Sequence, residues 1–132
     1  MRRPEVNDPG ETVGGSMLVV TRHRPVEPAA FLEQASGALA ALAAQTGCES
    51  AEVLCDLDEG AEYVIVTRWR DVGSYRRALS SFDVKVAAVG LLATALDQPS
   101  AFEARLTAEP GTGAVRAAAG DRAPDADTAG PQ

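Results

Sequence analysis

The spacing of apolar residues changes repeatedly between Met17 and Thr107, and the order of these changes limits the folds open to the chain. Short alternating or β-branched runs predict strands at 17–24, 48–57, 62–70 and 100–107. Apolar residues three or four positions apart predict helices at 28–46 and 72–90, with Gly90 expected to break or bend the second. The order predicts a ferredoxin-like βαββαβ fold of the α+β class, a four-stranded antiparallel sheet with two helices on one face.

The two ends of the chain differ in composition from this central part. Residues 1–16 and 108–132 are rich in Pro, Gly, Ala and Asp and contain few large apolar side chains. Too little apolar surface is available there to offset the entropy of ordering, so we expect a disordered N-terminal extension and a disordered acidic C-terminal tail around one domain, 17–107. Because Met17 begins the first expected strand, residues 1–16 are interpreted as an extension from an upstream start.

The face of the predicted sheet that the helices leave uncovered is also apolar. In the first expected strand, Leu18 and Val20 alternate with Val19 and Thr21, so both faces of the strand carry apolar side chains. An apolar face of this kind indicates an interaction site. The simplest partner is a second copy of the same sheet, which would form a symmetric homodimer.

Charge and motif content argue against several classes of protein. The formal net charge is −7, without the basic stripe that a nucleic-acid partner requires, and no apolar run reaches the ~18–20 residues of a membrane span. The acidic residues do not fall at metal-ligand spacings, and phosphate-binding or serine-nucleophile motifs are absent. Cys48 and Cys55 lie seven residues apart in one expected strand and so on opposite faces, which argues against a disulfide and favours a cytoplasmic setting.

Candidate functional residues gather where the third expected strand meets the second helix. Trp69, the only tryptophan, alternates with Tyr63, Ile65 and Thr67 on one face, and Tyr75 follows it by six residues. An indole there is either a stacking surface for a flat ligand or a core aromatic at a strand-to-helix junction. Likewise the Tyr75 phenol is either a hydrogen-bond donor to a substrate oxygen or the first apolar residue of the helix.

His23 is the only histidine of the chain and lies on the expected first strand. Its near-neutral pKa makes it a candidate general base or haem ligand. The flanking Arg22 and Arg24 favour the alternative of a solvated residue at the end of a strand. Both interpretations remain open at this point.

Four segments, MLVVTRHRP, GALAALAAQTGCESAEVL, EYVIVTRWRDVGSYRRALSSFDVKVAA and PSAFEARL, together resemble the antibiotic biosynthesis monooxygenase domain over about Met17–Thr107. The resemblance implies a dimeric α+β barrel, in which two ferredoxin-like protomers pair their sheets. It also implies oxidation of a hydrophobic aromatic, polyketide-type phenol or anthrone by O2, with no cofactor and no metal. The alternatives are a non-catalytic dimeric binding or accessory protein and, third, a haem-binding or haem-degrading protein.

The resemblance also assigns roles to residues. It places Trp69 and Tyr75 near the substrate and leaves His23 as the candidate base. The remaining residues expected at the substrate pocket are Tyr63, Ile65, Thr67, Thr21, Arg76, Leu79 and Phe82. Quinone-forming members add an asparagine on the third strand and an arginine late in the second helical region, where this chain has Ile65 and no basic residue in 86–96. Haem-degrading members carry a histidine in the second helix, and this chain has none there.

Overall fold

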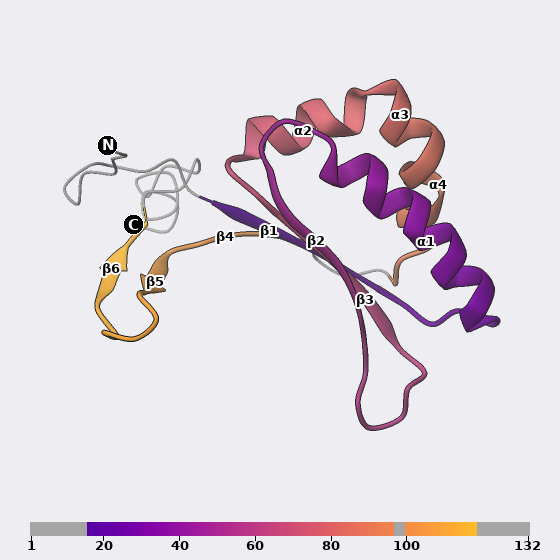
Figure 1. The fold of residues 1–132 in the computed structure, drawn as a ribbon, viewed down its shortest axis with the longest axis horizontal. Coiled ribbons are helices and arrows are strands. Elements are labelled where there is room, and N and C mark those ends of the chain that lie inside the picture. The colour runs from indigo at the N-terminus through magenta and orange to yellow at the C-terminus, as the bar shows by residue number, and fades with distance from the viewer. Residues whose placement is uncertain (1–15, 97–99, 119–132) are drawn as a thin grey trace, which may run out of the picture.

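The computed structural model describes residues 16–96 and 100–118. Its elements are β1 (Met17–His23), α1 (Pro28–Ala43), β2 (Cys48–Cys55), β3 (Tyr63–Trp69), α2 (Val72–Ser80), α3 (Phe82–Val84), the π-helical turn η1 (Lys85–Val89), α4 (Gly90–Leu92), β4 (Ala101–Glu103), β5 (Leu106–Ala108) and β6 (Val115–Ala117). The main sheet is antiparallel, in the order β2-β3-β1-β4. Figure 1 shows α1 and the run from α2 to α4 on the same side of this sheet, which confirms the predicted ferredoxin-like α+β fold.

The core lies between the sheet and the helices. Successive β1 residues alternate between buried and half-buried, and those facing the helices are at most 8% exposed. From the other side, α1 contributes a buried stripe at the spacings expected of one helix face: Phe31, Ala35, Ala38 and Leu42. The inward-facing residues of the strand and the buried stripe of the helix therefore pack against each other in one apolar layer.

The second helical region differs from the prediction in where it is interrupted. The break falls at Ser81, whose ψ of 149° is extended and whose hydroxyl accepts a hydrogen bond from Val84 N. Gly90 instead has regular helical angles, φ −61° and ψ −41°, and continues the run to Leu92. α2 ends before Ser81 because the Ser81 side chain caps the next helical turn. The spacing of apolar residues cannot predict such a hydrogen bond between a side chain and the backbone.

The expected last strand is divided between two sheets. β4 pairs with β1 over only three residues, and β5 pairs with β6 in a separate hairpin that Figure 1 shows away from the helices. Residues 108–118, expected to be a disordered tail, therefore include a strand, closed by a turn in which Gly111 and Gly113 have φ of 91° and 75°. Glycine adopts these angles without a Cβ penalty. The expected disorder of residues 1–15 and 119–132 lies outside the described residues.

The two cysteines also lie differently from the prediction. An irregularity between Cys48 and Ser50 shifts the register of β2, so that Cys48 is opposite Trp69 while Cys55 is opposite Tyr63. A bulge of this kind adds one residue and reverses the alternation, which places both cysteines on the same face rather than on opposite faces. They remain at opposite ends of β2, and both are free thiols.

Candidate functional site

Two hollows share one residue, Tyr75. The inner cavity, about 10 Å³, lies between sheet and helices and is lined by Val19, Thr21, Leu42, Ile65, Thr67, Tyr75 and Leu92. The outer groove, about 1170 Å³, is lined by Met17, Asp71, Val72, Gly73, Tyr75, Arg76, Arg77, Leu79, Ala101, Phe102, Glu103 and Arg105. The inner cavity has room for about one water molecule, so Tyr75 separates a nearly filled space from an open one.

The floor of the inner cavity is formed by two neighbouring strands. Val19 and Thr21 of β1 lie opposite Thr67 and Ile65 of β3 in the register. Since residues opposite each other in a sheet point to the same face, all four side chains face the helices. The result is an apolar enclosure in which the two threonine hydroxyls and the Tyr75 phenol are the polar groups.

The position of Tyr75 follows from how α2 begins. Asp71 caps the helix, its Oδ1 accepting a hydrogen bond from Ser74 N at 2.7 Å. The preceding Arg70 N donates to Gly47 O at 2.8 Å, and Gly47 (φ 92°) lies so near Ser74 that a Cβ there would be 2.3 Å from Ser74 Oγ. The helix therefore starts against the α1–β2 turn, which fixes Tyr75 one turn later.

Trp69 is completely buried, with 0% exposure, and lines neither hollow. Its Nε1 donates to Thr67 Oγ1 at 2.8 Å, and its ring centroid lies 5.5 Å from that of Tyr75 at an interplanar angle of 55°. The six-residue spacing thus brings the two rings into contact. The indole supports the cavity wall through Thr67 and Tyr75, and its N–H is engaged within the protein.

His23 is buried, with 2% exposure, which overturns the interpretation of a solvated strand end. β1 continues to pair through His23, opposite Tyr63, and the Phe31 ring of α1 lies 5.3 Å away. Its Nε2 is 2.9 Å from Thr21 Oγ1 and its Nδ1 is 3.2 Å from Thr94 Oγ1. Burial lowers the pKa of His23, which favours the neutral ring.

The arginines on either side of His23 misled the prediction because they point the other way. Arg22 lies on the opposite face of β1, where its guanidinium pairs with Glu62. Arg24 follows the end of β1 and also reaches Glu62, with Nε at 3.3 Å from Oε1. A charged neighbour on a strand therefore indicates nothing about the face to which the histidine belongs.

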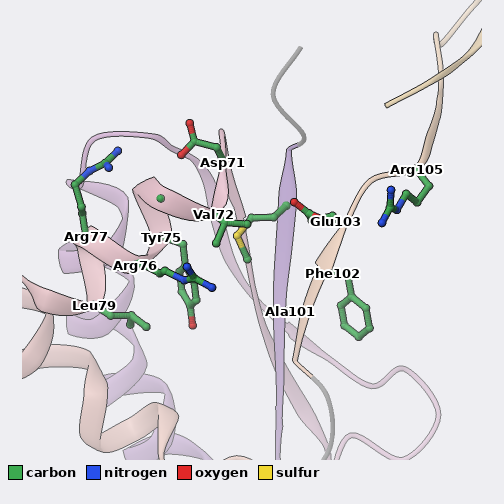
Figure 2. Close-up of a pocket in the computed structure, with 12 residues that line it drawn as sticks. Asp71, Val72, Tyr75, Arg76, Arg77, Leu79, Ala101, Phe102, Glu103 and Arg105 are labelled. Carbon is green, nitrogen blue, oxygen red and sulfur yellow. The ribbon is translucent and has the colours of Figure 1, made fainter. Parts of the chain in front are cut away.

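The other predicted pocket residues are divided by the structure. Arg76 and Leu79 line the outer groove, where Figure 2 shows the Arg76 side chain beside the Tyr75 ring and Arg77 directed away. Tyr63 lines neither hollow. Its ring packs against Phe31 at 5.4 Å, and its pKa is raised, chiefly by a hydrogen bond with Cys55. Phe82 is 77% exposed and also lies outside both hollows.

Several residues of the site were not among those predicted. Leu42 and Leu92 cover the inner cavity, and Thr94 bonds to His23. Leu42 belongs to the predicted apolar stripe of the first helix, so its spacing was the available signal. Leu92 and Thr94 follow Gly90, where a break was expected, and no pattern in the sequence indicated that the helix would carry them over β1.

The chemistry of the inner cavity is that of an enclosed apolar space. Burial raises the pKa of Tyr75, so its phenol stays protonated and can donate a hydrogen bond at neutral pH. Ile65, at the position where the resemblance implies an asparagine, is 2% exposed and closes part of the wall. Among the residues that the structure describes, Tyr75 is the one ionisable side chain that lines this cavity.

Metal-binding clusters and membrane-spanning helices are both absent from the described residues, 16–96 and 100–118. In this part of the chain, no three His, Cys, Asp or Glu side chains are grouped so that they could hold a metal ion. None of the helices described there has the length and apolar composition needed to cross a bilayer.

Family profiles and solved structures both contain proteins that are similar to this chain. The sequence profile of a family described as antibiotic biosynthesis monooxygenase matches residues 17–89. SnoaB, a cofactor-independent oxygenase from Streptomyces nogalater, is 26% identical with a TM-score of 0.62, over 74% of this chain and 98% of SnoaB. A candidate antibiotic biosynthesis monooxygenase from Deinococcus radiodurans is 24% identical, with a TM-score of 0.54, over 67% of this chain and 91% of its own. Curated protein sequences gave no significant match.

Proposed function

Because the chain belongs to the antibiotic biosynthesis monooxygenase family, we propose that it is a cofactor-independent monooxygenase. Its substrate would be a hydrophobic aromatic, polyketide-type molecule that carries a phenol or anthrone group, and its oxidant O2. The observation that carries the proposal is the inner cavity, which is enclosed and apolar apart from hydroxyl groups. Once enlarged toward the outer groove, a space lined in this way suits a flat apolar molecule with one or two oxygen atoms to recognise.

The substrate itself supplies the electrons in this reaction. An anthrone that loses a proton becomes an electron-rich anion, which reduces O2 and retains one oxygen atom as a new carbonyl, while the other oxygen leaves as water with two substrate hydrogens. The protein contributes an apolar enclosure, orientation of the rings and stabilisation of the anion. The Tyr75 phenol would donate a hydrogen bond to the anionic oxygen, and Trp69 would hold Tyr75 in place.

Substrate entry requires that the inner cavity enlarge toward the outer groove. Tyr75 belongs to both hollows, so rotation of its ring would join them. Arg76 and Leu79 lie on the groove side of Tyr75 and would form the rim over which the substrate passes. Ile65, Thr67 and Thr21 would then contact the bound rings. Tyr63 and Phe82 remain predicted contacts only, since they line neither hollow in this closed form.

The proposed active form is a cytoplasmic homodimer that pairs the uncovered faces of two sheets. Leu18, Val20, Val64 and Val66 are half-buried there, and Phe102 is 50% exposed. A second copy of the sheet would cover these apolar side chains. The free thiols Cys48 and Cys55 favour a reducing compartment.

The second candidate is a non-catalytic dimeric binding protein. Ile65, in the place of the implied asparagine, and the absence of a charged group from the inner cavity favour it. A haem protein has less support. His23, the only histidine, is 2% exposed and both of its ring nitrogens lie within hydrogen-bond distance of threonine hydroxyls.

Oxygen uptake decides between the two leading candidates. Metal-free protein would be incubated in air with a panel of anthrones and dihydroquinones, following O2 consumption and quinone absorbance. We expect catalysis that Tyr75→Phe lowers by about 100-fold, the cost of one donor to an oxyanion. The control is Tyr63→Phe, which removes the hydroxyl of the chain's other tyrosine, a residue that lines neither hollow. We expect this variant to lower the rate by less than about tenfold. Ligand binding without any rate above background would establish the binding protein instead.

A further inference from the structure

The hydrogen-bond partners of His23 determine which ring nitrogen carries the proton. The Thr94 hydroxyl donates to Leu91 O at 2.7 Å, and a hydroxyl has a single hydrogen. Toward His23 Nδ1, at 3.2 Å, Thr94 Oγ1 can therefore only accept. The neutral ring accordingly carries its hydrogen on Nδ1, which leaves Nε2 as an acceptor.

This tautomer fixes the direction of the bond to Thr21. Since Nε2 accepts, the Thr21 hydroxyl must donate its hydrogen to Nε2, across the observed 2.9 Å. The lone pairs of Thr21 Oγ1 then remain to accept a hydrogen bond on the cavity side, where Thr21 forms part of the wall. His23 does not line the inner cavity, but it is joined to it through one hydroxyl group.

Thr67, the other threonine of the cavity, has the opposite polarity. It is also bonded to the aromatic residue two positions further along its own strand, but the Trp69 indole can only donate. Thr67 Oγ1 therefore accepts from Trp69, and its own hydrogen is available to the cavity. One wall residue accepts a hydrogen bond from a ligand and its neighbour donates one.

We propose that Thr21 and His23 form a proton relay that deprotonates the substrate, while Thr67 donates a hydrogen bond to the anion that results. The acidic hydrogen of the substrate passes to Thr21 Oγ1 as the Thr21 hydroxyl hydrogen passes to His23 Nε2. The bonds that break are the substrate–H bond and the original Thr21 O–H bond. The bonds that form are a new Thr21 O–H bond and the His23 Nε2–H bond. The electron pair of the broken substrate–H bond stays on the substrate anion until O2 reacts with it. The proposal rests on the oxygenase function proposed above.

The surroundings of His23 fit a temporary proton acceptor. Phe31 from α1, Tyr63 from β3 and Thr94 after α4 are the neighbours described around the ring, and the nearby Arg22–Glu62 pair lies on the other face of the sheet. An imidazolium among these groups is stabilised chiefly by the substrate anion on the other side of Thr21. The proton is therefore held while the anion is present and, after oxidation, returns through Thr21 to the oxygen atom that leaves as water. In this scheme Thr21 touches the substrate, and His23 is a positioning residue that acts through it.

Nitrogen NMR tests the relay without any turnover. Because His23 is the only histidine, uniformly ¹⁵N-labelled protein freed of its affinity tag gives one pair of imidazole signals. We expect a protonated Nδ1 and an unprotonated Nε2 at neutral pH, and Thr21→Val should move the Nε2 signal. Thr67→Val, the matched change on the neighbouring strand, should leave both signals in place. A ring protonated on Nε2, or an Nε2 signal unaffected by Thr21→Val, would overturn the proposal.

Kinetics separate the relay from the oxygenase function. Thr21→Val should lower kcat by about 100-fold, the usual contribution of a positioned proton acceptor, and Thr21→Ser should restore most of it because the hydroxyl returns. The loss should shrink with substrates of lower pKa, which ionise without help. Wild-type turnover with an unimpaired Thr21→Val variant would reject the relay and keep the oxygenase. Absence of wild-type turnover would reject the oxygenase, and the NMR result would still decide the hydrogen-bond geometry.

Discussion

The two faces of the sheet are made from the same strands and differ in what covers them. On the helix-covered face of β1, Val19 and His23 are 3% and 2% exposed, whereas Leu18 and Val20 on the open face are only half-buried. The covered face holds the inner cavity and its hydroxyl groups. The open face holds apolar side chains and the Arg22–Glu62 pair. Under the proposals above, the covered face would support the chemistry and the open face would support association.

The largest expected effect comes from truncation on the covered face. Trp69→Ala removes a completely buried indole that contacts Tyr75 and Thr67. We expect a loss of about 3–5 kcal/mol in the free energy of unfolding, measured by urea denaturation. Arg68→Ala, the exposed neighbour on the other face, should change it by less than about 0.5 kcal/mol. Equal losses would contradict the assignment of the two faces.

A charge on the open face tests the proposed dimer. Val66 lies opposite Glu52 in the register, so Val66→Glu places two carboxylates side by side on an apolar surface. We expect the dimer dissociation constant to rise by about 100-fold or more, because an unpaired charge would be buried in the interface. Sedimentation measures the change, and Val66→Ile is the control that preserves the apolar surface. A dimer that Val66→Glu leaves intact would show that another surface associates.

Acid sensitivity should come from the covered face. Burial lowers the pKa of His23, so below its unfolded pKa of about 6.5 the unfolded chain takes up a proton that the folded chain does not. The contribution of neutral His23 to the free energy of unfolding is therefore fully present above that unfolded pKa. It decreases as the pH falls toward the lower pKa of the folded state. Urea midpoints measured from about pH 7.5 to about pH 5.5, one unit on either side of that unfolded pKa, would show the decline, and His23→Gln should flatten it. A decline unchanged by His23→Gln would assign it to another group.

The smallest effect is expected from the ion pair of the open face. The pKa of Glu62 is lowered, chiefly by its hydrogen bond with Arg22, so the pair stabilises the fold above the unfolded pKa of Glu62 and less as the pH falls through the folded value. Arg22 and Arg24 are 41% and 58% exposed, and water can replace their partner. Glu62→Gln should therefore move the urea midpoint far less than Trp69→Ala does, and added salt should weaken the contribution of the pair in the wild-type protein.

The parts of the fold that follow from local periodicity were predictable from the sequence. The βαββαβ order of the elements that form the main sheet and its helices, and the buried face of β3, were expected and are present. Contacts between distant segments were not predictable. The burial of His23 depends on Phe31 and Thr94, and the inner cavity depends on Leu92, which α4 brings over the sheet. Alternation identifies the face of a strand but not what lies above it.

The π-helical turn Lys85–Val89 has a consequence for the length of chain that can form the cavity roof. Such a turn holds one residue more than the α-helical turn it interrupts, and each residue of an α-helix advances the phase by about 100°. Deleting one residue within it would therefore leave an ordinary α-helical turn that covers nearly the same angle, so Leu92 would keep its place over the inner cavity. The roof of this cavity thus tolerates a change of one residue in chain length at the π-helical turn, because the turn takes up the extra residue without displacing the side chains that follow it.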